Sequence, residues 1–146
     1  MATKVIIQSL PDYTHAQLMT APGVSLVADE PEKDGGADLG PTPYELLTWA
    51  LGACTAMTIQ LYARRKGYAL QEVAVQVEHE RVHREDCDDC EIEGEGYVQH
   101  FHRRIVLRGE LSEAERDDLL RVAGKCPVHK TLMEPTEVHD SVEVVA

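Results

Sequence analysis

Aromatic and basic side chains are scarce in this sequence. Aromatic residues make up 5 % of the 146 residues, with one tryptophan and one phenylalanine, so leucine, valine, isoleucine and alanine must fill any core. Lysine and arginine together number 14 against 26 aspartates and glutamates, which gives a formal net charge of -12. Because the phosphates of nucleic acids repel a chain of this charge, nucleic acid is excluded as an expected partner.

We expect neither a secretory signal peptide nor a membrane-spanning segment. The first ten residues, "MATKVIIQSL", lack the long apolar segment and the cleavage site of a signal peptide. No apolar run approaches the roughly 18 residues that a membrane span needs. We therefore expect a cytoplasmic protein with no membrane partner. In that reducing compartment, catalysis, redox sensing or metal binding explains four cysteines better than structural disulfides do.

The chain is long enough for one domain with a core, and we predict a single domain over residues 1–146. In the first thirty residues, three short apolar segments are separated by "PDY" and "APG", which predicts a three-stranded meander. The polar, glycine-rich segment "EPEKDGGADLG" follows. It is predicted to be a loop that is mobile or that takes its order from a partner.

A long helix is predicted next. Thr42 suits the N-cap, Glu45 completes a capping box, and Gly67 suits the C-terminal stop after about Lys66. The helical segment "YELLTWALGACTAMTIQLYARR" is apolar on almost every face, which is typical of a helix surrounded by protein. One chain of this size has too little mass to enclose such a helix, so we expect a homodimer.

The second half of the chain predicts a long two-stranded ribbon, a second helix, a short helix and a closing strand, and hence an α+β fold. Two segments alternate with period two, and between them lies an acidic tip that contains two cysteines. Ser112 and Glu115 form a second capping box. The predicted segments are "ALQEVAVQVEHERVH" and "YVQHFHRRIVLRGEL" for the ribbon, "SEAERDDLLRVAGK" and "CPVHKTLME" for the helices, and "TEVHDSVEVVA" for the last strand.

Two isolated cysteines, Cys54 in the long helix and Cys126 before Pro127, are candidates for thiol chemistry. A free buried cysteine often packs as a small apolar residue, and that alternative stays open for Cys54. Cys126 lies beside a helix terminus and near His129, which can lower a thiol pKa. His129 can assist Cys126 or simply face solvent. Two unequal thiols suit a pair in which one forms a sulfenic acid and the other condenses with it to a disulfide.

The segment "GPTPYELLTWALGACTAMTIQLYARRKG", together with the later "CPVHKTL", resembles the OsmC/Ohr family of hydroperoxide-detoxifying proteins. The resemblance covers nearly the whole chain and implies an α+β fold that forms an intertwined homodimer. It also implies a thiol-dependent peroxidase that acts on organic hydroperoxides, needs no cofactor and is reduced by a dithiol such as a lipoyl group. By position, Cys54 would be the peroxidatic thiol and Cys126 the resolving thiol.

The charged residues of the family's site are displaced in this chain. Well-known members carry a glutamate ten residues before the first cysteine, where this chain has Tyr44, and Glu45 follows one position later. On a straight helix Glu45 lies nearly opposite Cys54, so direct pairing requires a kink near Gly52 or a carboxylate from the other subunit. No arginine precedes residue 64. A substitute cation is expected from the ribbon: Arg81, Arg103 or Arg104.

We expect the substrate to contact apolar residues of the long helix, namely Tyr44, Trp49 and Met57. Apolar surroundings at Cys54 favour an apolar hydroperoxide over hydrogen peroxide. The alternative is a redox-responsive or apolar-ligand-binding dimer of the same fold with little peroxidase turnover.

The cysteines of the ribbon tip, Cys87 and Cys90, are candidate zinc ligands. One CxxC motif supplies two ligands, and a structural zinc ion needs four, so two histidines of the ribbon are required. Period-two alternation favours His83 and His100 for this role, with His79 and His102 nearby. A local redox dithiol and a solvated tip without chemistry are the alternatives, and a metal-stabilised structural protein is a third class of function.

Overall fold

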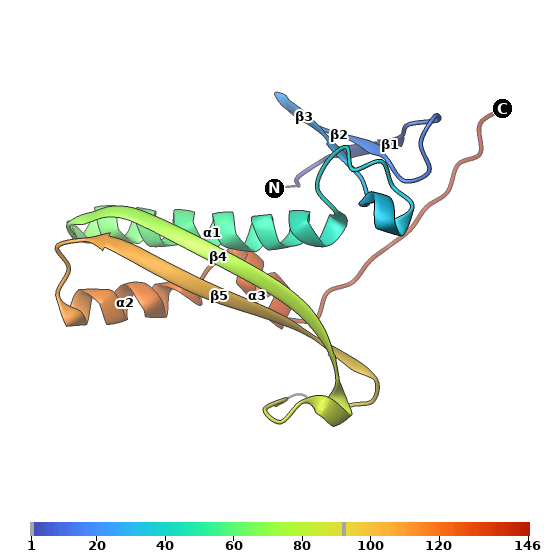
Figure 1. The fold of residues 1–146 in the computed structure, drawn as a ribbon. Helices are drawn as coiled ribbons and strands as arrows, with labels where there is room; N and C mark the ends of the chain where they lie inside the picture. The colour runs from blue at the N-terminus through green and yellow to red at the C-terminus, as the bar shows by residue number, and fades with distance from the viewer. Residues whose placement is uncertain (1, 92) are drawn as a thin grey trace. The chain divides into compact units, whose positions relative to one another are not determined.

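The structure is a computed structural model that describes residues 2–91 and 93–146, and it divides into two compact units, Met1–Trp49 and Ala50–Ala146 (Figure 1). The predicted α+β class is confirmed. The helices are α1 (Pro43–Lys66), α2 (Glu113–Ala123) and α3 (Pro127–Met133), with short 3-10 turns η1 (Glu32–Asp34) and η2 (Arg84–Asp86). The strands are β1 (Ile6–Ser9), β2 (Gln17–Ala21), β3 (Val24–Ala28), β4 (Leu70–His83) and β5 (Tyr97–Gly109). That the two units act as one domain stays a prediction.

The N-terminal unit contains the predicted meander. β1, β2 and β3 form an antiparallel sheet in that order, so the prediction from the first thirty residues is confirmed. Gly23 lies in the tight turn between β2 and β3 with φ of 80°, a left-handed conformation that favours glycine. The turn residues that predicted the meander therefore lie in the turns between its strands.

The glycine-rich loop after β3 is ordered by Asp29. This carboxylate is buried, and it accepts hydrogen bonds from the backbone N–H groups of Glu30 (2.8 Å), Ala37 (3.0 Å) and Leu39 (3.2 Å). Burial on its own raises the pKa of Asp29, but the three backbone hydrogen bonds outweigh it and lower the pKa. The loop thus takes its order from its own chain, where the sequence predicted mobility or order supplied by a partner.

The ends of α1 are those that the sequence predicts. The Thr42 N–H donates to Glu45 Oε2 at 2.8 Å, and the Glu45 N–H donates back to Thr42 Oγ1 at 3.2 Å, which completes the capping box. At the other end Gly67 takes φ of 69°. The carboxylate of Glu45 is therefore engaged with the helix N-terminus.

Only one narrow stripe of α1 is buried. It consists of residues four apart on one face: Leu51, Thr55, Ile59 and Ala63. Trp49, Met57 and Leu61 are exposed on other faces. The predicted homodimer would cover such faces, and it stays a prediction.

By length and composition alone, α1 is the one helix in the described part of the chain that could cross a membrane. The core helix of a soluble protein meets the same criteria. The sequence-based expectation differed because it counted uninterrupted apolar runs, whereas small and polar residues interrupt the apolar ones along α1.

The second unit is built on the predicted ribbon, in which β4 and β5 pair antiparallel with Val77 opposite Arg103 and Glu80 opposite His100. Side chains alternate between the two faces of a strand, so Arg103 and His100 lie on opposite faces. A Cβ atom on Gly52 of α1 would lie 3.2 Å from Val77 Cγ2. Glycine at this position thus permits the close approach of α1 to the ribbon, which Figure 1 shows.

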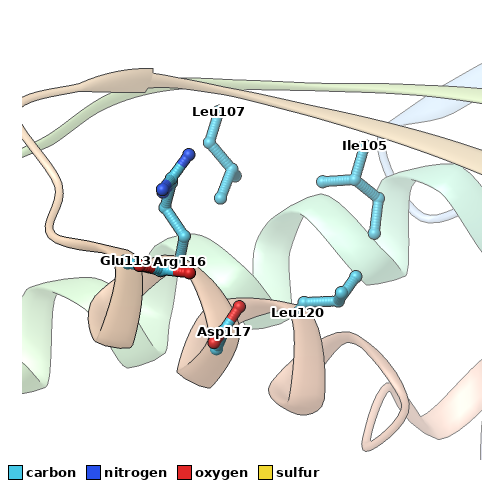
Figure 2. Close-up of a pocket in the computed structure, with 6 residues that line it drawn as sticks. All are labelled: Ile105, Leu107, Glu113, Arg116, Asp117 and Leu120. Carbon is cyan, nitrogen blue, oxygen red and sulfur yellow. The ribbon is translucent and has the colours of Figure 1, made fainter.

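The core of this unit lies between α1, α2 and one face of the ribbon. Ile59 and Ala63 of α1 pack with Leu119 and Ala123 of α2, and all four are buried. The capping box of Ser112 at the start of α2 is formed as predicted. A groove of about 270 Å³ lies between β5 and α2, and Figure 2 shows side chains of both elements facing it. Its lining residues are Ile105, Leu107, Glu113, Arg116, Asp117 and Leu120, none of which is a predicted site residue.

The predicted closing strand is wrong for the described chain. The residues after α3, numbers 134–146, have no regular secondary structure, and their valines are exposed, Val142 by 94 %. A strand requires a neighbouring strand to satisfy its backbone N–H and C=O groups. Within the described residues, nothing pairs with this segment, so its period-two pattern has no sheet to join.

A polar network that joins α2 to Tyr68, between α1 and β4, should make stability depend on acid pH. Asp118 accepts hydrogen bonds from Arg121 and from Tyr68, whose hydroxyl lies 2.8 Å away. Arg121 first, and then Tyr68, lower the pKa of Asp118 from 3.8 to about 2. The same contact with Asp118 raises the pKa of Tyr68 to about 12.

Because the pKa of Asp118 is lower in the folded chain, the stability that its charge supplies is complete above pH 3.8 and is lost as the pH falls to about 2. Asp118→Asn should remove this part of the acid dependence, so thermal unfolding of the variant should change less over that pH window. Asp117→Asn leaves the network intact and should retain the wild-type loss. Equal acid profiles for wild type and Asp118→Asn would contradict the assignment.

Candidate active site

The structure brings Cys54 and Cys126 together. Cys54 lies in the middle of α1, and Cys126 is the N-cap residue of α3, which begins at Pro127. Neither is in a disulfide; Cys126 is fully buried and Cys54 is partly exposed. The interaction of the two thiols raises the pKa of Cys54 and lowers the pKa of Cys126.

Cys126 is the acceptor at the centre of this site. Burial raises the pKa of its thiol, but hydrogen bonds from the Cys54 thiol, the His129 N–H, the Thr55 hydroxyl and the Val128 N–H together lower it below the ordinary value. The His129 N–H lies 3.4 Å from Cys126 Sγ. These donors therefore favour the ionised form of Cys126.

Cys54 is the donor of the pair. Burial raises the pKa of its thiol, and the hydrogen bond to Cys126 raises it further, which outweighs the lowering contacts of the Val128 backbone and Thr58. The pKa of Cys54 thus lies above the ordinary thiol value and that of Cys126 below it, so Cys126 is the more readily ionised thiol of the pair. The sequence predicted a lowered thiol pKa at Cys126, beside a helix terminus and His129, and the shift at Cys126 has that direction.

Arg103 is the cation of the site. It projects from β5 and spans three acceptors: Nη1 donates to Thr55 Oγ1 at 3.0 Å and to the Ala123 carbonyl at 3.2 Å, and Nη2 donates to His129 Nδ1 at 2.9 Å. Planar guanidinium groups suit such multiple contacts. The residue therefore ties α1, the end of α2 and α3 to the ribbon around the thiol pair.

The contact with Arg103 fixes the state of His129. A guanidinium group can only donate, so His129 Nδ1 accepts, and the ring is neutral with its proton on Nε2. Burial lowers the pKa of His129, and the charge of Arg103 lowers it further. His129 therefore supports the neighbouring thiol through its backbone N–H and is not itself a cation.

Thr55 connects Arg103 to the thiols. Its buried Oγ1 accepts from Arg103, and its single proton has two acceptors within reach. One is the Leu51 carbonyl oxygen at 2.7 Å, and the other is the sulfur of Cys126, whose pKa this hydroxyl lowers. Rotation of one hydroxyl hydrogen can thus stabilise negative charge on Cys126.

Of the three arginines proposed from the sequence, Arg103 is the one whose described contacts are to residues beside the thiols, Thr55 and His129. Arg81 stacks on the ring of Tyr97 at 4.1 Å, and Arg104 is exposed. The sequence held a usable signal, because Arg103 shares the face of β5 that carries Ile105 and the core. A charged residue in an otherwise apolar period-two series requires a buried partner. No sequence signal of this kind identified Thr55 as a residue of the site.

The predicted substrate residues are exposed, and Glu45 has a structural role at the start of α1. Tyr44, Trp49 and Met57 are exposed by 52 %, 60 % and 66 %. A pocket that they line therefore needs a further covering surface, and their role stays a prediction. Glu45 serves the capping box, and its catalytic role stays a prediction as well.

The tip of the ribbon forms a second cluster. Cys87 and Cys90 are joined in a disulfide, and His100 Nε2 lies 3.7 and 3.6 Å from their sulfur atoms. These three residues form one group of candidate metal ligands among the described residues. His83, which the sequence favoured as a fourth ligand, lies outside this group and accepts the Glu85 N–H as the N-cap of η2.

Comparison with known proteins places the chain among a set of related structures. The family model described as OsmC-like protein matches residues 35–139. No curated protein matches the chain in sequence. An OsmC-like protein from Mycoplasma pneumoniae is 18 % identical, with a TM-score of 0.70 over 91 % of this chain and 88 % of that chain.

Two further solved structures are similar. The organic hydroperoxide resistance protein OsmC from Legionella pneumophila is 17 % identical, with a TM-score of 0.65 over 90 % of this chain and 89 % of that chain. An organic hydroperoxide resistance protein from Elizabethkingia anophelis is 16 % identical, with a TM-score of 0.65 over 90 % of this chain and 87 % of that chain. At these identities the likeness shows the fold alone.

Proposed function

Because the chain belongs to the OsmC-like protein family, we propose that it is a cysteine-based peroxidase that reduces organic hydroperoxides. The observation that carries this proposal is the pair of free thiols, Cys54 and Cys126, which shift each other's pKa beside Thr55, the acceptor of a hydrogen bond from Arg103. The names of two structural neighbours, which are organic hydroperoxide resistance proteins, support the same class of substrate.

The difference in exposure supports Cys54 as the thiol that reacts first. Cys54 is the partly exposed thiol and Cys126 is fully buried, so a hydroperoxide meets Cys54 first. The Cys126 thiolate takes the proton of Cys54, and the new Cys54 thiolate attacks the terminal oxygen of the hydroperoxide. An S–O bond forms, the O–O bond breaks, and the departing alkoxide takes the proton from Cys126 and leaves as the alcohol. Cys54 is now a sulfenic acid, and Cys126 is again a thiolate.

The second step joins the two cysteines. The Cys126 thiolate attacks the sulfur of the Cys54 sulfenic acid, the S–O bond breaks, and hydroxide leaves as the disulfide forms. A dithiol reductant of the lipoyl type would return the pair to its thiol state by exchange. The Cys126 thiolate thus acts twice in this scheme. It is first the base that takes the proton of Cys54, and then the nucleophile that resolves the sulfenic acid.

Arg103 acts as a positioning residue in this scheme. It holds the Thr55 hydroxyl and the His129 ring, and the Thr55 hydroxyl and the His129 N–H both donate to Cys126. No cofactor is needed for these steps. We propose in addition that the protein acts as a cytoplasmic homodimer, in which a second copy covers the exposed apolar residues of α1, including Trp49 and Met57.

Peptide mapping of the disulfides tests the proposal. The protein is fully reduced, freed of reductant and treated with one equivalent of an alkyl hydroperoxide, and the disulfides are identified by mass spectrometry. We expect a rapid Cys54–Cys126 linkage. A Cys87–Cys90 linkage that forms while Cys54 stays reduced would overturn the proposal and move the chemistry to the ribbon tip.

A redox-responsive or ligand-binding dimer with little turnover is the second candidate function. The observation in its favour is that burial raises the pKa of Cys54, the more accessible thiol, which slows its reaction with peroxides. Steady-state turnover with a dithiol reductant distinguishes the two. Formation of the disulfide in a single event, without sustained turnover, favours the sensor.

A further inference from the structure

We propose that the ribbon tip is a redox-controlled site for a thiophilic divalent metal of the zinc class, held by Cys87, Cys90 and His100. In this proposal the Cys87–Cys90 disulfide is the oxidised form of the site, and the dithiol is the form that binds the metal. The site is separate from the thiol pair, because His100 lies on the face of β5 opposite to Arg103.

The distances between the ligand atoms suit a tetrahedral ion. His100 Nε2 lies 3.7 Å from Cys87 Sγ and 3.6 Å from Cys90 Sγ. Zinc bonds of about 2.3 Å to sulfur and about 2.0 Å to nitrogen, at tetrahedral angles, separate these atoms by about 3.6 Å. The imidazole is therefore at a suitable distance from both sulfur atoms, and after reduction these atoms must move apart to about 3.8 Å to complete the tetrahedral arrangement.

A carboxylate supports the histidine from behind. Glu80 lies opposite His100 in the ribbon register, and its Oε1 is 3.8 Å from His100 Nδ1. When Nε2 of a histidine binds a metal, Nδ1 carries the proton, and a carboxylate on that side fixes the tautomer and strengthens the ligand. Glu80 also contacts His102 Nε2 at 2.9 Å, which holds the carboxylate in place.

The charge of the tip favours a bound cation. Acidic residues surround the two cysteines in "REDCDDCEIEGEG". Their negative charges attract a divalent ion, which two thiolates would help to neutralise. Asp89 Oδ1 lies 3.9 Å from Cys87 Sγ, so a carboxylate or a water molecule is available for the fourth position.

An organic hydroperoxide is the oxidant that would switch the site. The two metal-bound thiolates give up two electrons and form the Cys87–Cys90 bond. The hydroperoxide takes these electrons and two protons, its O–O bond breaks, and it leaves as an alcohol and water. The metal ion loses both sulfur ligands and is released. A phosphine or a dithiol supplies the two electrons for the return.

The test uses the full chain with Cys54 and Cys126 both replaced by serine, so that all thiol signals come from the tip. After reduction with a phosphine and removal of the excess, the protein is titrated with Co²⁺ and with Zn²⁺. We expect one ion per chain, with sulfur-to-cobalt charge-transfer bands for Co²⁺ and displacement of Co²⁺ by Zn²⁺. One equivalent of an alkyl hydroperoxide should release the ion and restore the disulfide.

Matched variants identify the ligands. Cys90→Ser and His100→Gln should each weaken metal binding by at least about 100-fold, and Glu80→Gln by about 10- to 100-fold. Arg104→Gln, on the same face of β5 and exposed, should bind within about 3-fold of the parent. Circular dichroism establishes that each variant is folded.

Two results would overturn the proposal. One is that the reduced parent binds no stoichiometric Co²⁺ or Zn²⁺. The other is that folded Cys90→Ser and His100→Gln variants bind as tightly as the parent. Because Cys54 and Cys126 are absent from every protein in this test, neither result bears on the proposed peroxidase.

Discussion

Replacing Cys54 with serine should abolish hydroperoxide reduction, with kcat/KM lower by at least about 1000-fold, or about 4 kcal/mol of transition-state stabilisation. The serine hydroxyl is not ionised by the neighbouring Cys126 and is a poor nucleophile towards peroxide oxygen. Steady-state consumption of an alkyl hydroperoxide with a dithiol reductant measures the loss. The Cys87→Ser variant, altered only at the ribbon tip, should keep at least about half of wild-type turnover.

Cys126→Ser separates the two steps of the same reaction. Without the buried thiolate, Cys54 loses its base and its resolving partner, so the reaction should slow and then stop at the sulfenic acid. A sulfenic-acid trapping reagent should label Cys54 in this variant and not in the wild type. Turnover that survives Cys54→Ser would rule out the assigned nucleophile, whatever the outcome for Cys126.

Replacing Arg103 with methionine should have the second-largest effect, a fall in kcat/KM of about 10- to 100-fold, or about 1.4 to 2.8 kcal/mol. Methionine keeps much of the length of the side chain and removes the donors to Thr55, the Ala123 carbonyl and His129. The loss of buried hydrogen bonds should also lower the free energy of unfolding by roughly 1 to 3 kcal/mol.

The arginine experiment has a control at the next residue. Arg104 is exposed, so Arg104→Met should change neither turnover nor stability appreciably. A positioning role predicts that the apparent pKa of the thiol pair rises in Arg103→Met, which the ultraviolet absorbance of the thiolate reports. Arg103→Lys should recover only part of the activity, because an ammonium group cannot span three acceptors. An unchanged thiol titration in Arg103→Met would show that the arginine is merely structural.

Local signals in the sequence were sufficient for most of the fold. Thr42 with Glu45, and Ser112 with Glu115, marked helix starts that the structure confirms, because a capping box is formed within four residues. The ribbon followed from period-two alternation. The prediction of a strand after α3 was wrong because a strand depends on a paired strand elsewhere in the structure, and the local sequence pattern does not show whether that partner exists.

The candidate site was only partly predictable. Cys54, Cys126 and His129 were recognisable from residue type and from the family resemblance, and the structure brings them together. The division of charge between the thiols was not predictable, because it depends on donors that converge from separate elements, such as Thr55. Arg103 was one of three candidates until the packing of β5 on the helices distinguished it.

At the ribbon tip, the structure brings Cys87, Cys90 and His100 of the predicted ligand set into one cluster. His83 lies outside this cluster, and Glu80, which the sequence analysis did not single out, lies near His100 instead. The difference depends on register. His83 lies next to η2 and caps it, whereas Glu80 lies directly across from His100. A shift of three residues along a strand changes both the face on which a side chain lies and the residue opposite it on the paired strand. The preferences of single residues do not predict such a shift.

The exposure of Trp49 gives the protein a built-in optical reporter. It is the one tryptophan of the chain, its side chain is 60 % exposed, and it stands at the residue where the first compact unit ends, five positions before Cys54. Its fluorescence therefore comes from a single, known location. A surface that covers α1 there moves the indole emission towards the blue, so assembly can be followed without a label by diluting the protein and recording its emission spectrum.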